Sequence, residues 1–128
     1  MKQENKELLL RDLCARLPYE VKLYRTYGEC VSLELRSVDV GNDKLVFYTY
    51  KGDGLEICDT DTIERFGQLK YKPYLFPLSS MTDEQKIELT CIIDSDYAQV
   101  DWYNKKHFDY RGLIEKGLAL DATGLGIY

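Results

Sequence analysis

Apolar residues at the start of the chain recur at intervals of three and four, with charged residues between them. This spacing predicts a helix from Gln3 to Leu17 with one apolar face. Pro18 ends the helix, because a residue before proline is disfavoured in helical backbone. The apolar face contains Leu9, Leu10, Leu13, Cys14 and Leu17. The charged residues, which we assign to the polar face, are Lys6, Glu7, Arg11, Asp12 and Arg16. We therefore expect an amphipathic helix packed on a flat partner.

The pattern then changes to the alternation that is typical of β-strands. Apolar and polar positions alternate in residues 21–25 and 31–36, which predicts half-buried strands and places Glu34 on a wet face. Residues 44–50 are apolar or aromatic on both faces, so we expect a central strand there. A short strand at 55–58 follows. The close turns between these segments favour an antiparallel meander, because parallel strands need a crossover of about a dozen residues.

Polar residues and prolines mark the next part of the chain. Residues 59–62 are able to cap a short helical turn that ends at Gly67. Pro73 restricts the residue before it, which predicts extended backbone over residues 68–74. Pro77 interrupts the chain again.

Helical patterns return after residue 81. Thr82 with Gln85 three positions later forms the pattern of a capping box, which predicts a helix start. Its expected buried side consists of Ile87, Leu89, Cys91, Ile92 and Ile93. Residues 97–107 predict a short helix or loop around Trp102. Asp109 is placed to cap a last helix, whose apolar residues are Leu113, Ile114, Leu118 and Ala119.

These elements predict an α+β fold. It has an N-terminal helix, an antiparallel meander sheet of three to five strands, and C-terminal helices packed on one face. A chain of 128 residues has about the length of one domain, so residues 1–120 are assigned to a single α+β domain. Residues 121–128 contain two glycines and are expected to form a loose C-terminal tail.

Composition narrows the possible partners and the compartment. The net charge of −5 argues against tight binding to a phosphate backbone, which requires a basic face. The polar N-terminal residues lack the apolar run of a signal peptide, and no window has the length of a membrane span. We therefore expect a cytoplasmic protein that does not associate with membranes. Its expected partner is a protein, either a different one or a second copy of this chain in a small homo-oligomer.

The cysteines and acidic pairs do not predict a metal or cofactor site. Four cysteines are scattered singly, without the Cys-x-x-Cys pair that is typical of zinc sites, and each lies in an apolar pattern that predicts a core position. They are Cys14, Cys30, Cys58 and Cys91. The two Asp-x-Asp pairs, at 59–61 and 94–96, lack the further oxygen ligands of a calcium loop. We assign no metal and no cofactor.

Two stretches resemble a known family. They are KPYLFPLSSMT at residues 72–82 and HFDYRGLIEKGLAL at 107–120, and the sequence LCARLPY at 13–19 is similar as well. Together they resemble a family of short hypothetical proteins from gut bacteria and their phages and prophages. The resemblance implies a cytosolic accessory protein of phage or mobile-element origin. It implies no particular chemistry and no functional residue.

His107 is the one histidine and the first candidate for chemistry. A histidine near a carboxylate, here that of Asp109, can act as a general base. This alternative makes the protein a small hydrolase or a nucleotide-modifying enzyme that uses His107. Such a base needs a nucleophile or bound water, and no nucleophile motif accompanies it. The competing interpretation makes Asp109 a helix cap and Arg111 a surface residue or partner of Glu115.

Eleven tyrosines are the second feature that bears on function. Five of them lie near lysines in the predicted sheet, which would suit stacking on single-stranded nucleic acid: Tyr24, Tyr48, Tyr50, Tyr71 and Tyr74. Tyrosine rings are also typical of protein interfaces, and the negative charge favours that interpretation. The favoured hypothesis is therefore a non-catalytic protein–protein interaction or accessory protein. Its predicted contact residues are Tyr74, Phe76, Trp102, His107, Tyr110 and Arg111.

Overall fold

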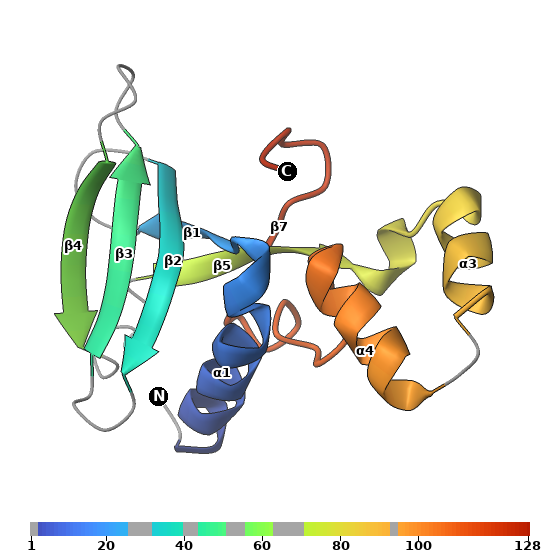
Figure 1. The fold of residues 1–128 in the computed structure, drawn as a ribbon, viewed down its shortest axis with the longest axis horizontal. Helices are drawn as coiled ribbons and strands as arrows, with labels where there is room; N and C mark the ends of the chain where they lie inside the picture. The colour runs from blue at the N-terminus through green and yellow to red at the C-terminus, as the bar shows by residue number, and fades with distance from the viewer. Residues whose placement is uncertain (1–2, 26–31, 40–43, 51–55, 63–70, 93–94) are drawn as a thin grey trace.

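A helix, a sheet and a second group of helices follow one another along the chain (Figure 1). The computed structural model describes residues 3–25, 32–39, 44–50, 56–62, 71–92 and 95–128. The first half consists of α1 (Gln3–Arg16), the 3-10 turn η1 (Leu17–Tyr19), β1 (Lys22–Arg25), β2 (Ser32–Asp39), β3 (Lys44–Tyr50) and β4 (Glu56–Thr62). The second half consists of β5 (Tyr71–Pro77), η3 (Leu78–Ser80), α3 (Asp83–Thr90), α4 (Asp96–Lys105), β6 (Phe108–Asp109) and β7 (Leu120–Asp121).

The sheet has the order β4-β3-β2-β1-β5-β6, and β7 also pairs with β5. The predicted α+β class is confirmed, and so is the antiparallel meander through β1–β4. The expectation of a wholly antiparallel sheet is wrong, because β6 and β7 both pair with β5 in parallel. The long connection through α3 and α4 makes the first of these parallel pairings possible, since it returns the chain to the same end of β5.

Helix α1 packs its predicted leucine face on the sheet. Leu9 and Leu13 are buried against Val21 and Leu23, at the start of the sheet, and against Leu75 of β5. These residues share one core with Leu35, Tyr71, Leu113, Leu118 and Ala119. The alternation predicted for residues 21–25 is confirmed at Val21 and Leu23. The core therefore joins the first helix, the middle of the sheet and the last turns of the chain.

The other side of α1 differs from the prediction. Asp12 and Arg16, assigned to the polar face, are fully buried and form an ion pair of 2.8 Å between Arg16 Nε and Asp12 Oδ2. Arg111 adds a contact of 3.2 Å to Asp12 Oδ1. Cys14, assigned to the apolar face, is exposed. Later segments of the chain cover this side of α1, as the contacts of Arg111 and Phe108 show. The spacing of apolar residues within a helix cannot predict which distant segments will cover its polar face.

The helix from Asp83 is confirmed, together with its capping box. The Thr82 hydroxyl accepts from the Gln85 backbone N–H, and the Gln85 side chain accepts from the Thr82 N–H. The buried side expected for this helix is wrong, because Ile87 is 65% exposed and Cys91 is exposed. Figure 1 shows the reason: α3 lies beyond the end of β5, away from the strands that the structure describes.

Two further local predictions are corrected. Glu34, expected on a wet face, is buried next to Lys22, whose Nζ lies 3.9 Å from its carboxylate. Asp59 to Thr62, expected to cap a helical turn, belong to β4 and pair with β3. The turn expected to end at Gly67 and the side chains of Cys30 and Cys58 lie outside the described residues.

The helix expected after Asp109 does not form. Residues 113–117 are turns, and both Gly112 and Gly117 have a positive φ, of 76° and 73°. Left-handed backbone at these two positions is incompatible with a continuous right-handed helix. The Asp109 carboxylate still caps backbone, because it accepts from the N–H groups of Leu113 and Ile114 at 2.9 Å each.

The last residues lie against the sheet at both ends of their segment. Ala122 is buried, and its N–H donates to the Leu75 carbonyl at 2.9 Å. Tyr128 donates its hydroxyl to the Tyr74 carbonyl. Residues 121–128, expected to be a loose tail, therefore have an anchor on β5 near each end. Among the described residues there is no helix with the length and apolar character needed to cross a membrane.

We expect Asp12→Ala to destabilise the protein by about 3–5 kcal/mol, because it leaves Arg16 as a buried charge without its partner. The measurement is urea denaturation followed by circular dichroism. Glu7→Ala removes an exposed carboxylate from the same helix and is the matched control, with an expected change within about 0.5 kcal/mol. Equal changes for the two variants would contradict the role given to Asp12.

Candidate functional site

The predicted contact residues gather around the ends of β5 and β6. The ring of Phe76 lies 6.1 Å from the ring of Phe108, which stacks on Trp102 at 5.6 Å. Tyr103, next to Trp102, stacks on Tyr110 at 5.5 Å. Phe76, Trp102 and Tyr110, which the sequence singled out, therefore belong to one cluster, although they come from a strand, a helix and a loop. Phe108 and Tyr103 connect them, whereas Tyr74 packs on Tyr24.

Trp102 lies in the interior of this cluster. It is 6% exposed, and its Nε1–H donates to the Glu88 carboxylate at 2.9 Å. That hydrogen bond, with the positive charge of Lys106 nearby, holds the pKa of Glu88 below its usual range. Trp102 therefore joins α3 to α4 and offers little area to a partner.

Tyr110 is held by two arginines. The guanidinium of Arg111 lies 4.7 Å from the ring centroid and that of Arg16 lies 5.5 Å from it. Both distances are typical of cation–π contacts. Arg111, expected to be a surface residue or the partner of Glu115, pairs with Asp12 instead. The aromatic ring therefore rests on the buried ion cluster of α1.

His107 ends helix α4 and turns the chain into β6. Its φ of 63° is left-handed, the conformation that usually follows a helix end, and its N–H donates to the Asn104 carbonyl at 3.2 Å. Its ring stacks on Tyr128 at 3.7 Å, and its Nδ1 is buried without a hydrogen-bond partner among the described residues. Burial, with the positive charges of Arg16 and Lys22, lowers the pKa of His107 to about 4.

The pairing of His107 with Asp109 that the enzyme alternative required is not found among the described residues. Both carboxylate oxygens of Asp109 accept backbone N–H groups of the following turn. The imidazole faces an aromatic ring and is neutral at pH 7. A general base of the expected kind needs a group that orients it and access to a substrate proton. The geometry therefore supports a packing role for His107.

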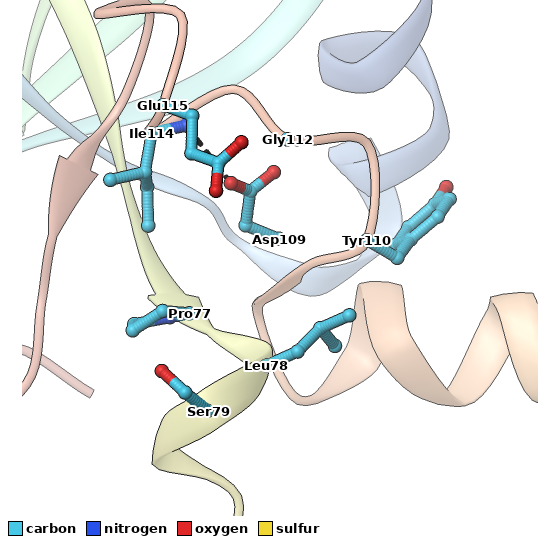
Figure 2. A pocket seen from close by; sticks show the side chains of 8 residues that line it. All are labelled: Pro77, Leu78, Ser79, Asp109, Tyr110, Gly112, Ile114 and Glu115. Carbon is cyan, nitrogen blue, oxygen red and sulfur yellow. Dashed lines mark hydrogen bonds between the residues drawn. The ribbon is translucent and has the colours of Figure 1, made fainter.

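A hollow opens beside this cluster, where the chain leaves β5 (Figure 2). Its volume is about 360 Å³. The lining residues come from two segments, the end of β5 with η3 and the loop that begins in β6. They are Pro77, Leu78, Ser79, Asp109, Tyr110, Gly112, Ile114 and Glu115.

Much of the wall of the hollow is apolar, and its charged side chains are both acidic. Pro77, Leu78 and Ile114 supply aliphatic surface, and Leu78 is 42% exposed. Figure 2 shows the carboxylates of Asp109 and Glu115 near one another on one side of the hollow. The arrangement suits a side chain with an aliphatic stem and a cationic end.

Several of these residues were missed by the sequence predictions. Leu78 and Glu115 were not named as contact residues, and Ile114 was assigned to a helix. All of the lining residues lie within the stretches 72–82 and 107–120 that carry the family resemblance. That coincidence was the available signal, but only the parallel pairing of β5 with β6 brings the two stretches together.

The tyrosines that the nucleic-acid alternative required do not all lie on one exposed face of the sheet. Tyr71 is buried in the core, whereas Tyr24 and Tyr74 pack edge to face with ring centroids 6.2 Å apart. The side chains of Tyr48 and Tyr50 lie outside the described residues. Within the described parts of the chain, His, Cys, Asp and Glu form no group of three or more that could hold a metal ion.

Comparisons with known protein families, with curated proteins and with solved structures found no match to this chain.

We expect stability to fall as the pH is lowered through the range in which His107 titrates. Its folded pKa of about 4 is below the usual 6.5, so the unfolded chain binds more protons between these values. The contribution of neutral His107 to the free energy of unfolding is therefore fully present above pH 6.5 and is lost as the pH falls toward 4. The loss is up to about 1 kcal/mol per pH unit after allowance for screening. Thermal melting between pH 6.5 and 5 measures this slope above the main titration of the carboxylates.

His107→Asn is the matched variant, because asparagine tolerates left-handed backbone but does not titrate. We expect its melting temperature to vary less over the same pH range. A slope identical to that of the unchanged protein would show that His107 is not the source of the pH dependence.

Proposed function

We propose that this protein is a non-catalytic protein-recognition domain, and that the hollow between η3 and residues 109–115 receives a segment of its partner. The observation that carries the proposal is the combination of aliphatic walls, an exposed Leu78 and an acidic edge in one cavity of about 360 Å³. A cavity of this size accommodates one or two side chains or a small ligand.

Two of the polar groups that line the hollow, the Asp109 carboxylate and the Pro77 carbonyl, already have structural partners. Asp109 caps the following turn, and the Ser80 hydroxyl donates to the Pro77 carbonyl at 2.7 Å. Groups that hold backbone in this way fix the shape of the walls. This supports recognition by shape and charge, and it gives no support to the hydrolase that the sequence left open.

Charge favours a basic partner segment. The chain carries a net charge of −5, and the Glu115 side chain is exposed at the edge of the hollow. A lysine or arginine can lay its methylene groups along Leu78 and Ile114 while its charged end meets the carboxylates. We therefore expect the partner to present a lysine or arginine next to an aliphatic or aromatic residue.

The resemblance in sequence supports the biological setting of this proposal. The stretches 72–82 and 107–120 resemble short proteins of gut bacteria and their phages, and they also supply the whole lining of the hollow. An accessory protein of phage or mobile-element origin that works in the cytoplasm is consistent with both. The family-like stretches would then be the parts that meet the partner.

Selection from a library of random displayed 12-residue peptides tests the proposal. We expect enriched peptides to carry lysine or arginine beside an apolar residue, and Leu78→Asp to weaken their binding at least 10-fold, because it places a charge on the aliphatic wall. Glu115→Gln should weaken binding by a few-fold and reduce its dependence on salt. Fluorescence anisotropy of labelled peptides measures both effects.

Leu125→Asp is the matched control, since Leu125 is 57% exposed and lies outside the hollow. It should leave the affinity unchanged. Failure to enrich any peptide, or enriched peptides that bind the Leu78→Asp variant as well as the unchanged protein, would overturn the proposal.

A further inference from the structure

The pairing between β1 and β5 ends at Leu23 and Pro73, and a side chain takes the place of the next backbone hydrogen bond. The two strands pair through Leu23 with Pro73 and continue through residues 24–25 with 71–72. The same register places Lys22 opposite Tyr74. Because Pro73 has no N–H and bonded pairs alternate with non-bonded ones in antiparallel strands, Lys22 and Tyr74 would be the next bonded pair.

The Tyr128 hydroxyl lies between these two backbone groups. It accepts from the Lys22 N–H at 2.8 Å and donates to the Tyr74 carbonyl at 2.8 Å. Tyr128 is 39% exposed, and its partial burial raises the pKa of its hydroxyl, which keeps the proton that it donates. The phenol therefore bridges the two strands where a direct bond between them is expected.

The ring of Tyr128 also makes contacts, with His107 and Phe76. It lies parallel to the His107 ring, with 3.7 Å between centroids and 13° between planes. Phe76 contacts it from another side, with ring centroids 5.8 Å apart and a tilt of 58°. A flat aromatic wall and a donor–acceptor pair at its end are together the complement of a phenol.

The chain that carries Tyr128 has few other attachments. In residues 123–126 the backbone N–H groups of Thr123 and Leu125 donate locally, to the Asp121 carboxylate at 2.8 Å and to the Ala122 carbonyl at 3.2 Å. Gly124 and Gly126 are exposed and have positive φ, a backbone conformation that glycine adopts without strain. The ring is held by the site and tethered by an exposed loop, which is the arrangement of an intramolecular ligand.

We propose that Lys22 N–H, the Tyr74 carbonyl and the rings of Phe76 and His107 form a binding site for a para-substituted phenol, the phenol slot. Tyr128 fills the phenol slot from the same chain, and a tyrosine side chain or a small phenol fills it when residues 123–128 are displaced. This site is separate from the hollow and does not depend on its function.

The hydroxyl decides which ligands the phenol slot accepts. A ring without it stacks on His107 but leaves the Lys22 N–H without the acceptor it has in this structure. Sites built to hydrogen-bond a hydroxyl discriminate strongly against analogues that lack one. We therefore expect toluene to bind at least 10-fold more weakly than p-cresol.

The test uses the full chain with Tyr128→Ala, titrated with p-cresol and observed by NMR. His107 is the one histidine in the chain, so its ring protons report on the phenol slot directly. We expect saturable shifts of these protons with p-cresol at millimolar concentration and a much weaker response to toluene. The unchanged protein should need several-fold more p-cresol, because Tyr128 competes for the slot, and Leu125→Ala should behave like the unchanged protein.

N-acetyltyrosinamide distinguishes the two sources of the phenol. Its binding alongside p-cresol supports a peptide tyrosine as the ligand, and binding of p-cresol alone supports a small phenol. No shift in the folded Tyr128→Ala variant, or equal affinity for toluene and p-cresol, overturns the proposal. If that variant is unfolded, its refolding by p-cresol and not by toluene supports the slot, and failure of p-cresol to refold it overturns the proposal.

Discussion

One buried carboxylate connects the first helix to the second half of the chain. Asp12 accepts from Arg16 at 2.8 and 3.2 Å and from Arg111 at 3.2 Å. Arg16 also donates to the Phe108 carbonyl at 2.6 Å. Buried charges are tolerated only where they are paired and hydrogen-bonded, so these contacts leave little freedom in how α1 meets β6. Tyr110 lies beneath the same two guanidinium groups, and the wall that it gives to the hollow depends on them.

Reversals of the backbone in the second half build both proposed sites. Left-handed conformation at His107 ends α4 and lets its carbonyl accept from the Phe76 N–H at 2.8 Å. The same residue presents its ring to Tyr128. Left-handed conformation at Gly112 then folds the following turn back over Asp109, which forms one side of the hollow. His107 and Gly112 are five residues apart, so the phenol slot and the hollow take residues from neighbouring parts of the chain.

The sequence predicted correctly those elements that depend on residues close to one another in the chain. The capping box of Thr82 and Gln85 was correct because both partners lie within one turn. The last helix was wrong because the apolar spacing around Leu113 resembles that of a helix while two glycines adopt left-handed backbone, and spacing contains no information on φ. The buried face of α3 was wrong at Ile87 because periodicity identifies an apolar face and does not show whether anything covers it.

The sequence by itself determined the α+β class, the antiparallel meander and the start of α3. Only the tertiary structure decided that Asp12 and Arg16 are buried, that Leu78 and Ile114 face one hollow, and that Tyr128 bridges β1 and β5. Each of these depends on contacts between segments tens of residues apart, such as Tyr128 with Lys22. Local spacing reflects the preferences of neighbouring residues, whereas such contacts are set by how the completed elements pack against one another.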